Sequence, residues 1–284
     1  MSKSSSHATE PLVINDNNLS RAWARIFLRI LEASGTEISP LVLSINGFDD
    51  ENRVGETPYL RSALDAALSE NENFSIDIVA STIFPQRIWQ VAGRNRKRLF
   101  HLYRQVFPRY VAMKKALNGR GLYFERLTMF REKMPCEGNQ LEWILSQFHS
   151  RPGVRDSMFQ AAIFDPVRDH VNNARVGFPC LQHLSFVPTA EGLVVNAFYA
   201  TQYVFDKAYG NYLGLVQLGA FMAGEMGLRL ARLNVMVGVA KIDGVNKNDP
   251  RLKLLVDACR EVRATLERDS ADTLDEAPLS EAAA

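Results

Sequence analysis

Hydrophobic and polar positions follow two different patterns along the chain, one with helical and one with extended spacing. Residues 18–32 carry apolar side chains at helical spacing, begin at the polar Asn18 and are followed by Gly35, which predicts a helix. The same criteria predict four more helices, at Tyr59–Leu68, Arg96–Leu117, Asn139–Phe148 and Arg251–Glu267. Residues 211–228 are apolar or small at nearly every helical angle, so this segment is predicted to be a helix buried at the centre of the core.

Short runs rich in β-branched and aromatic residues, bounded by Gly, Pro or Asp, predict strands between these helices. They are SPLVLSI (39–45), FSIDIVASTIF (74–84), SMFQAAIF (157–164), LQHLSFVP (181–188), GLVVNAFYATQYVF (192–205) and LARLNVMVGVAKID (230–243). The mixture predicts an α+β fold in which a mixed β-sheet packs around the buried central helix.

The two ends of the chain differ in composition from its middle. Residues 1–15 are Ser-rich and residues 267–284 are acidic and rich in small side chains, so both are predicted to be disordered tails. No internal repeat or biased linker divides the residues between them. We therefore expect one domain over residues 16–266.

Composition narrows the class of protein. The 284 residues are 46% hydrophobic and 23% charged, as in a globular protein with a large core, and the net charge of +1 gives no reason to expect nucleic acid or a membrane surface as a partner. No secretion leader and no apolar run of ~18 residues is found, so we expect a cytoplasmic location. The three cysteines are widely spaced, which favours free thiols over a disulfide framework or a metal site.

The most informative motif is GFPCLQHLSF at residues 177–186, in which a Pro-Cys pair opens a predicted strand. A turn, a long second strand and then Asn211, 31 residues after Cys180, follow in order. Upstream, YFER (123–126) precedes the helical run NQLEWIL (139–145). Over roughly 120 residues this order resembles the thymidylate synthase family, which includes pyrimidine-nucleotide hydroxymethylases. The resemblance implies a thymidylate synthase-like fold.

The resemblance also implies a chemistry. In this family a cysteine thiolate adds to C6 of a pyrimidine, so that C5 can attack a one-carbon unit from 5,10-methylenetetrahydrofolate. Cys180 takes the place of that nucleophile, with Tyr123 and Glu125 as further catalytic candidates, Glu125 by position alone. The implied substrate-binding residues are Asn211, Asp243, Lys241, Arg155, Arg126 and Tyr203. A homodimer with sheets packed back to back is implied as well, in which Arg155 reaches the phosphate in the neighbouring site.

This chain departs from the family at the sugar-phosphate end of the site. Ala200 and Thr201 stand where the family has an arginine and a serine that bind phosphate, and Tyr203 replaces an aspartate. Lys241 and Asp243 replace the His and Tyr that hold the sugar. They can supply a cation and a hydrogen-bond acceptor, or they can form a solvated strand end.

Each of the other candidates has a purely structural alternative. Cys180 can be an inert buried thiol, Asn211 a helix N-cap and Tyr123 a core aromatic residue. Arg155 can be a solvated surface charge.

Three functions remain open from the sequence. The first is an enzyme that adds a methyl or hydroxymethyl group to C5 of a pyrimidine nucleotide or nucleoside, where Asn211 favours a uracil-type ring. The second is a non-catalytic nucleotide-binding protein of the same fold with a rebuilt sugar-phosphate pocket. The third is a folate-independent transformation of a modified pyrimidine.

Overall fold

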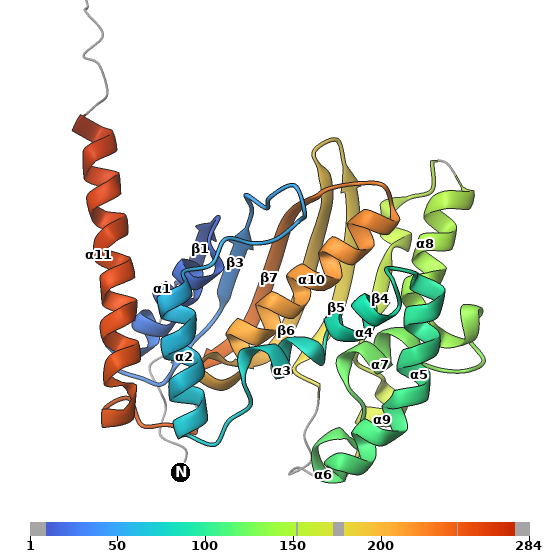
Figure 1. The fold of residues 1–284 in the computed structure, drawn as a ribbon, viewed down its shortest axis with the longest axis horizontal. Coiled ribbons are helices and arrows are strands. Elements are labelled where there is room, and N and C mark those ends of the chain that lie inside the picture. The colour runs from blue at the N-terminus through green and yellow to red at the C-terminus, as the bar shows by residue number, and fades with distance from the viewer. Residues whose placement is uncertain (1–9, 152, 173–178, 243, 276–284) are drawn as a thin grey trace, which may run out of the picture.

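A mixed β-sheet runs through the computed structural model, which describes residues 10–151, 153–172, 179–242 and 244–275 (Figure 1). Its strand order is β1-β3-β7-β6-β5-β4, and β2 pairs with β7 beside this path. The pairs β1–β3 and β6–β7 are parallel and the others are antiparallel. The strands are β1 (Leu12–Asp16), β2 (Glu37–Ile38), β3 (Leu41–Ile45), β4 (Gln160–Ala162), β5 (Leu181–Thr189), β6 (Gly192–Tyr203) and β7 (Leu230–Lys241).

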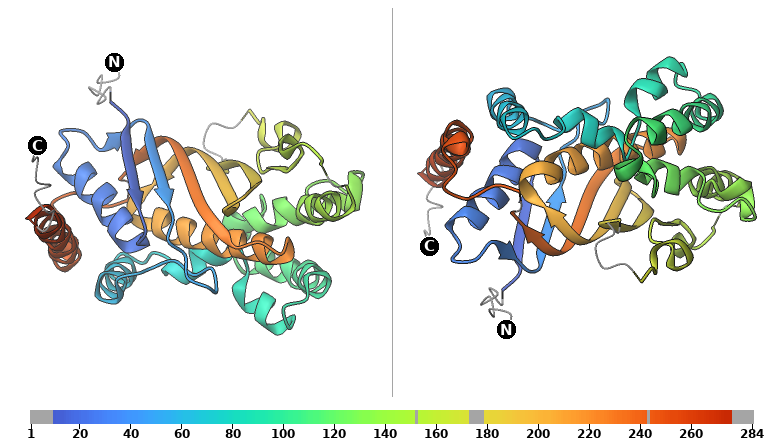
Figure 2. Two further views of the ribbon diagram at one scale, coloured as in Figure 1. Left: turned by 90° about the horizontal axis from the view of Figure 1, so that it is seen from above. Right: turned by 90° about the horizontal axis from the view of Figure 1, so that it is seen from below.

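The main helices cover one face of this sheet, as Figure 2 shows from two sides, and no described helix crosses the middle of the opposite face. The α-helices are α1 (Leu19–Glu32), α2 (Pro58–Glu70), α3 (Ile76–Ser81), α4 (Gln86–Val91), α5 (Arg96–Met113), α6 (Lys115–Asn118), α7 (Tyr123–Thr128), α8 (Gln140–Ser150), α9 (Pro166–Asp169), α10 (Tyr209–Glu225) and α11 (Lys253–Asp275). Short turns of other helix types are η1 (Pro135–Gly138), η2 (Asp156–Met158), η3 (Val204–Ala208) and η4 (Pro250–Leu252). The predicted α+β class with a mixed sheet is confirmed.

Helix α10 is the buried central helix that the sequence predicted. Thirteen of its 17 residues are buried, because it packs against β6 and β7 on one side and against α1 and α3 on others. Two glycines of α10 allow this helix to approach α3 closely. A Cβ on Gly210 would lie 2.7 Å from the carbonyl oxygen of Ile76, and one on Gly214 would lie 2.6 Å from that of Ala80. The backbones of α3 and α10 therefore meet directly at these glycines.

The strand predicted at residues 74–84 is wrong, because this segment contains helix α3. Ser75 caps the helix by accepting a hydrogen bond from the backbone N–H of Ile78. Ile76, Val79 and Ala80 are the buried residues, at the i, i+3 and i+4 spacing of a helix. Packing on α10 outweighs the β-propensity of the Ile and Val side chains, since that propensity depends strongly on context.

The predicted limits of the two tails are also wrong. β1 begins at Leu12, inside the segment 1–15, where it pairs in parallel with β3 and buries Ile14. Five residues give too short a pattern to be recognised without the partner strand. At the other end, α11 packs against α1 and α2 and its helix continues through Asp275, beyond residue 266. Only three residues of the strand predicted at 157–164 are extended, as β4, and η2 precedes them.

The remaining predicted elements are confirmed with small shifts in their ends. These are α1, α2, α5, α8, α11, β3, β5, β6 and β7. Among the described residues, no helix combines the length and apolar character that a bilayer crossing requires.

Candidate active site

Cys180 lies where three neighbouring inner strands of the sheet, β5, β6 and β7, have adjacent ends. β5 begins directly after it, and because β5 is antiparallel to β6 and β6 is parallel to β7, the start of β5 adjoins the ends of the other two. The backbone carbonyl of Cys180 accepts a hydrogen bond from the N–H of Ala200 at 3.0 Å, which fixes it beside β6. The side chain is half-buried against the core.

Charged groups from two further elements act on the Cys180 thiol. Burial raises its pKa, and the carboxylate of Asp206 raises it further, whereas the ammonium groups of Lys241 and Lys207 lower it. Asp206 and Lys207 lie in η3, the turn that joins β6 to α10, and their side chains form an ion pair at 3.3 Å. The net effect favours the neutral thiol, so the thiolate needed for nucleophilic attack would have to be promoted by a ligand or a proton acceptor.

Tyr123 is the first residue of α7, and its phenol is affected by groups at the start of β5. Burial raises the pKa of its phenol, and the charge of Cys180 raises it further. Hydrogen bonding of the Tyr123 oxygen to the backbone N–H groups of Leu181 and Cys180 acts to lower this pKa. The Tyr123 hydroxyl thus lies at the start of β5.

A second tyrosine, Tyr199 on β6, was missed by sequence reasoning. It is fully buried, its pKa is raised well above the usual value by burial and by the charges of Tyr123, Tyr212 and Cys180, and its hydroxyl has no hydrogen-bond partner in the described part of the chain. A buried hydroxyl without a hydrogen-bond partner is costly and uncommon in folded proteins.

Asn211 lies in the first turn of α10 and is 4% exposed. It is not the cap of this helix, because Ala208 occupies the N-cap position. The N-cap alternative for Asn211 is therefore excluded. Helix α10 follows directly after the η3 turn, which carries Asp206 and Lys207.

Cationic side chains meet aromatic rings at two places near this edge. The Lys241 ammonium lies 5.1 Å from the centre of the Tyr203 ring, across the ends of β7 and β6. The ammonium groups of Lys114 and Lys207 lie 4.2 and 5.3 Å from the centre of the Phe74 ring. Both arrangements are within cation–π range. Asp243, predicted to bind the sugar, lies outside the described residues.

Three predicted site residues have other surroundings. Glu125 is buried and bonded to Arg168 at 3.0 Å, and burial raises its pKa while Arg168 partly opposes the shift. Arg126 is fully buried in a bidentate pair with Asp169, at 2.6 and 2.7 Å, and donates further hydrogen bonds to two backbone carbonyls. Arg155 is exposed before η2.

Glu125 is paired with Arg168 and Arg126 with Asp169 at the contact between α7 and α9, so both side chains have partners within the chain. Their catalytic and substrate-binding roles stay predictions. The structure brings Cys180, Tyr123, Lys241 and Tyr203 together at the sheet edge. It adds Asp206, Lys207 and Tyr199, whose only signal in the sequence was their position near the end of a long strand.

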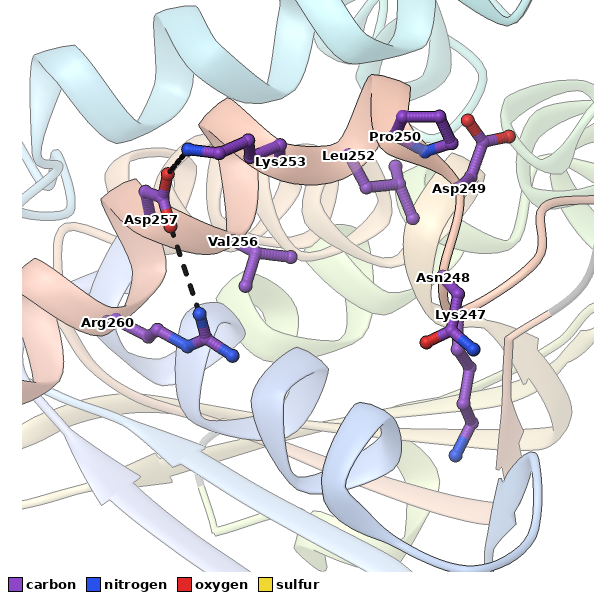
Figure 3. Close-up of a pocket in the computed structure, with 9 residues that line it drawn as sticks. All are labelled: Lys247, Asn248, Asp249, Pro250, Leu252, Lys253, Val256, Asp257 and Arg260. Atoms are coloured by element: carbon purple, nitrogen blue, oxygen red, sulfur yellow. Dashed lines mark hydrogen bonds and ion pairs between the residues drawn. The ribbon is translucent and has the colours of Figure 1, made fainter.

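The hollow drawn in Figure 3 lies elsewhere, at the start of α11. Its charged groups are engaged: Lys253 and Arg260 pair with Asp257 at 2.7 and 3.8 Å. The Lys247 ammonium donates to the carbonyls of Ile30, Leu31, Ala33 and Gly35 at the end of α1. The charged side chains around this hollow therefore have partners within the chain, and Lys247 stabilises the end of α1. Within the described residues, no group of three or more His, Cys, Asp or Glu side chains is placed to hold a metal ion.

Comparison with protein-family models and with curated proteins identified no relative of this chain. No protein-family model matches the chain, and no curated protein gives a significant match. The likeness to thymidylate synthases therefore rests on the sequence motifs alone.

Proposed function

We propose that the protein has a thymidylate synthase-like fold and transfers a one-carbon unit, methyl or hydroxymethyl, to C5 of a pyrimidine nucleotide or nucleoside. The observation that carries this proposal is the group around Cys180. A half-buried thiol lies at the end of the central strands, with the Tyr123 hydroxyl at the same strand end and two lysines that act to lower the thiol pKa. Asn211 follows in the first turn of the buried helix, as the resemblance requires.

The proposed reaction begins at the Cys180 sulfur. Its thiolate forms a bond to C6 of the ring, and the electrons of the C5–C6 double bond move to give an enolate with its charge on O4. C5 then forms a bond to the one-carbon electrophile. The C5 proton leaves to a base, and the bond between the one-carbon unit and its donor breaks, which leaves an exocyclic methylene on C5 and the free donor. Hydride from the donor, which is oxidised in that step, then gives methyl, or water gives hydroxymethyl, as the C6–sulfur bond breaks to restore the ring double bond and the thiolate. Lys207 and Lys241 favour the anionic states of this sequence, and the amide of Asn211 is suited to donate to O4.

The resemblance implies 5,10-methylenetetrahydrofolate as the compound that supplies the electrophile. The Phe74 ring, with Lys114 and Lys207 beside it, fits a ligand that joins flat rings to carboxylates. The same pair of ammonium groups also suits a phosphate, which would offset the arginine absent at Ala200.

The test is release of tritium from C5 of labelled pyrimidine nucleosides and nucleotides, with and without the folate. We expect release from the wild type and none from Cys180→Ser. Cys259→Ser is the matched control, because this second thiol is buried against α1 and α2, where burial raises its pKa to about 12. Equal release by wild type and Cys180→Ser would contradict the proposal.

A non-catalytic nucleotide-binding protein is the second candidate, and a specific observation favours it. The Cys180 pKa is raised rather than lowered, and the carboxylate of Glu125 is committed to Arg168. A binder of this kind should retain its ligand affinity in Cys180→Ser and release no tritium under any condition.

We further propose a homodimer formed through the open face of the sheet. Phe198 on β6 and Met236 on β7, two central strands, are 40% and 50% exposed, and Val13 on the edge strand β1 is 62% exposed in the same row of paired residues. Asn196, Asn234 and Ser44 form a hydrogen-bonded row across the same strands. Light scattering after size exclusion should give twice the chain mass, and Phe198→Asp should give a monomer. A wild-type monomer at micromolar concentration would contradict this arrangement.

A further inference from the structure

The near-neutral net charge of the chain hides a strong local asymmetry. Residues 78–124 contain ten of the 33 lysines and arginines and no aspartate or glutamate. This stretch runs from the second half of α3 through α4, α5 and α6 to the start of α7. Figure 1 shows α5 on the outside of the molecule, at the end opposite α11.

The cations on α5 share one side of the helix. At about 100° per residue, Lys97, Arg98, His101, Arg104 and Arg109 fall within about 140° of arc, and all five are exposed. We call these five residues the basic face. The buried residues of the helix, Leu99 and Tyr103, lie on the opposite side. The basic face is therefore directed to solvent by the packing of the helix itself.

Little within the chain neutralises the basic face. Arg104 forms an exposed ion pair with Glu137 at 2.8 Å, whereas Lys97, Arg98 and Arg109 have no acidic partner in the described part of the chain. Arg96 illustrates the contrast, because it points toward the core and is paired with both Glu142 and Glu225.

We propose that the basic face of α5 binds the phosphate backbone of a nucleic acid. From Lys97 to Arg109 the helix rises about 18 Å, which corresponds to about five phosphates of one strand. This length exceeds what a single nucleotide needs. Three of the four cations are arginines, whose planar guanidinium groups suit phosphate oxygens. A hollow beside the face is lined by Phe100, His101, Arg104 and Thr128 and offers an aromatic edge to a base.

Other anionic partners fit less well. An anionic membrane would require several apolar side chains to insert beside the cations, but Met113 at the end of α5 is the one large apolar side chain of this helix among the exposed hydrophobic residues that the structure describes. Leu99, Phe100, Tyr103, Phe107 and Tyr110 pack against the core. An acidic protein would require an apolar anchor within the patch, and the basic face has none.

The experiment is fluorescence anisotropy of the full chain with labelled single-stranded RNA, single-stranded DNA and duplex DNA. We expect the affinity for at least one of them to fall with salt, with a log–log slope of about −3 for four phosphate contacts on a single strand. The variant Arg98→Gln/Arg109→Gln should bind about 25-fold more weakly near 0.1 M salt, since removing one cation from a phosphate weakens binding about fivefold. Lys253→Gln/Arg260→Gln on α11 is the matched control and should bind as the wild type does.

Three results would overturn the proposal. They are no binding of any nucleic acid at about 50 mM salt, equal binding by the wild type and the α5 variant, and equal or tighter binding of polyglutamate or of phosphatidylserine-containing vesicles. The inference does not depend on the proposed catalysis, because Cys180→Ser should leave this binding unchanged. Loss of tritium release with retained nucleic-acid binding would therefore separate the two proposals.

Discussion

The contact between α3 and α10 can be tested by adding a single methyl group. In Gly210→Ala the new Cβ would lie 2.6 Å from the Cβ of Val79 and 2.7 Å from the carbonyl oxygen of Ile76. Ordinary contacts between carbon atoms are about 3.5–4.0 Å, so the methyl group is about 1 Å too close. One of the two obstacles is backbone, so the overlap is relieved only if α3 moves.

The expected cost follows from two opposing effects. Overpacking of this kind costs up to about 3 kcal/mol, while replacing glycine by alanine in a helix gains up to about 1 kcal/mol. The net loss of unfolding free energy is about 2 kcal/mol, which corresponds to a fall in Tm of about 5 °C for a chain of this size. Gly224→Ala on the same helix is the matched control, because nothing lies within 4 Å of its Cβ, and it should raise Tm by about 2 °C.

Thermal unfolding followed by circular dichroism measures both variants under the same conditions. A Gly210→Ala variant that is stabilised as much as Gly224→Ala would refute the reasoning. It would mean that residues 76–81 do not pack on α10 as a helix, and the correction to the predicted strand would fail with it.

Three further predictions concern buried charge and the thiol. Lys247→Met should cost about 2 kcal/mol, because four carbonyls at the end of α1 lose their cation, and urea unfolding would show it; an unchanged midpoint would exclude this role. Arg126→Met should cost about 3–5 kcal/mol at pH 7 by leaving the Asp169 carboxylate buried without its partner. Burial acts to raise the pKa of Asp169, but the hydrogen bonds from Arg126 and the backbone lower it overall, so the wild type loses stability as the pH falls through about 4. In the variant the carboxylate pKa is raised, so stability should rise as the pH falls, and the same acid dependence in both proteins would count against the pair. Alkylation of Cys180 should be slow at pH 8, accelerate as the pH rises above 9 and become faster in Asp206→Asn, as peptide mass spectrometry can follow; a slower reaction in that variant would show that the carboxylate does not oppose the thiolate.

Local patterns predicted most of the helices and strands because their signals lie within one element. The periodicity of residues 211–228 identified a helix buried on most sides, and the alternation in β6 identified a long strand. The failures at α3 and β1 have a common cause. Both elements depend on a partner distant in the sequence, α10 for one and β3 for the other, and a short window contains no information about that partner.

The candidate site was predictable only in part for the same reason. The Pro-Cys motif and the spacing to Asn211 located two residues, and Tyr123 followed from its place in the order of motifs. Asp206 and Lys207 act on the thiol only because η3 turns the chain back over the sheet edge. Glu125 and Arg126 have the residue types of a polar site, yet three-dimensional packing pairs them with Arg168 and Asp169. The net charge of +1 gave no indication of the basic stretch at residues 78–124, because the acidic residues that balance it lie elsewhere in the chain.

The central claim is that the Cys180 sulfur bonds to C6 of a pyrimidine ring. The most direct measurement is the intact mass of the protein after incubation with 5-fluoropyrimidine nucleosides and nucleotides and the folate, because fluorine at C5 cannot leave as the proton does and the adduct should accumulate. The account predicts a mass increase equal to ligand plus donor, mapped to the peptide of Cys180 and absent in Cys180→Ser. An unmodified protein after incubation with every analogue that it binds would contradict the claim.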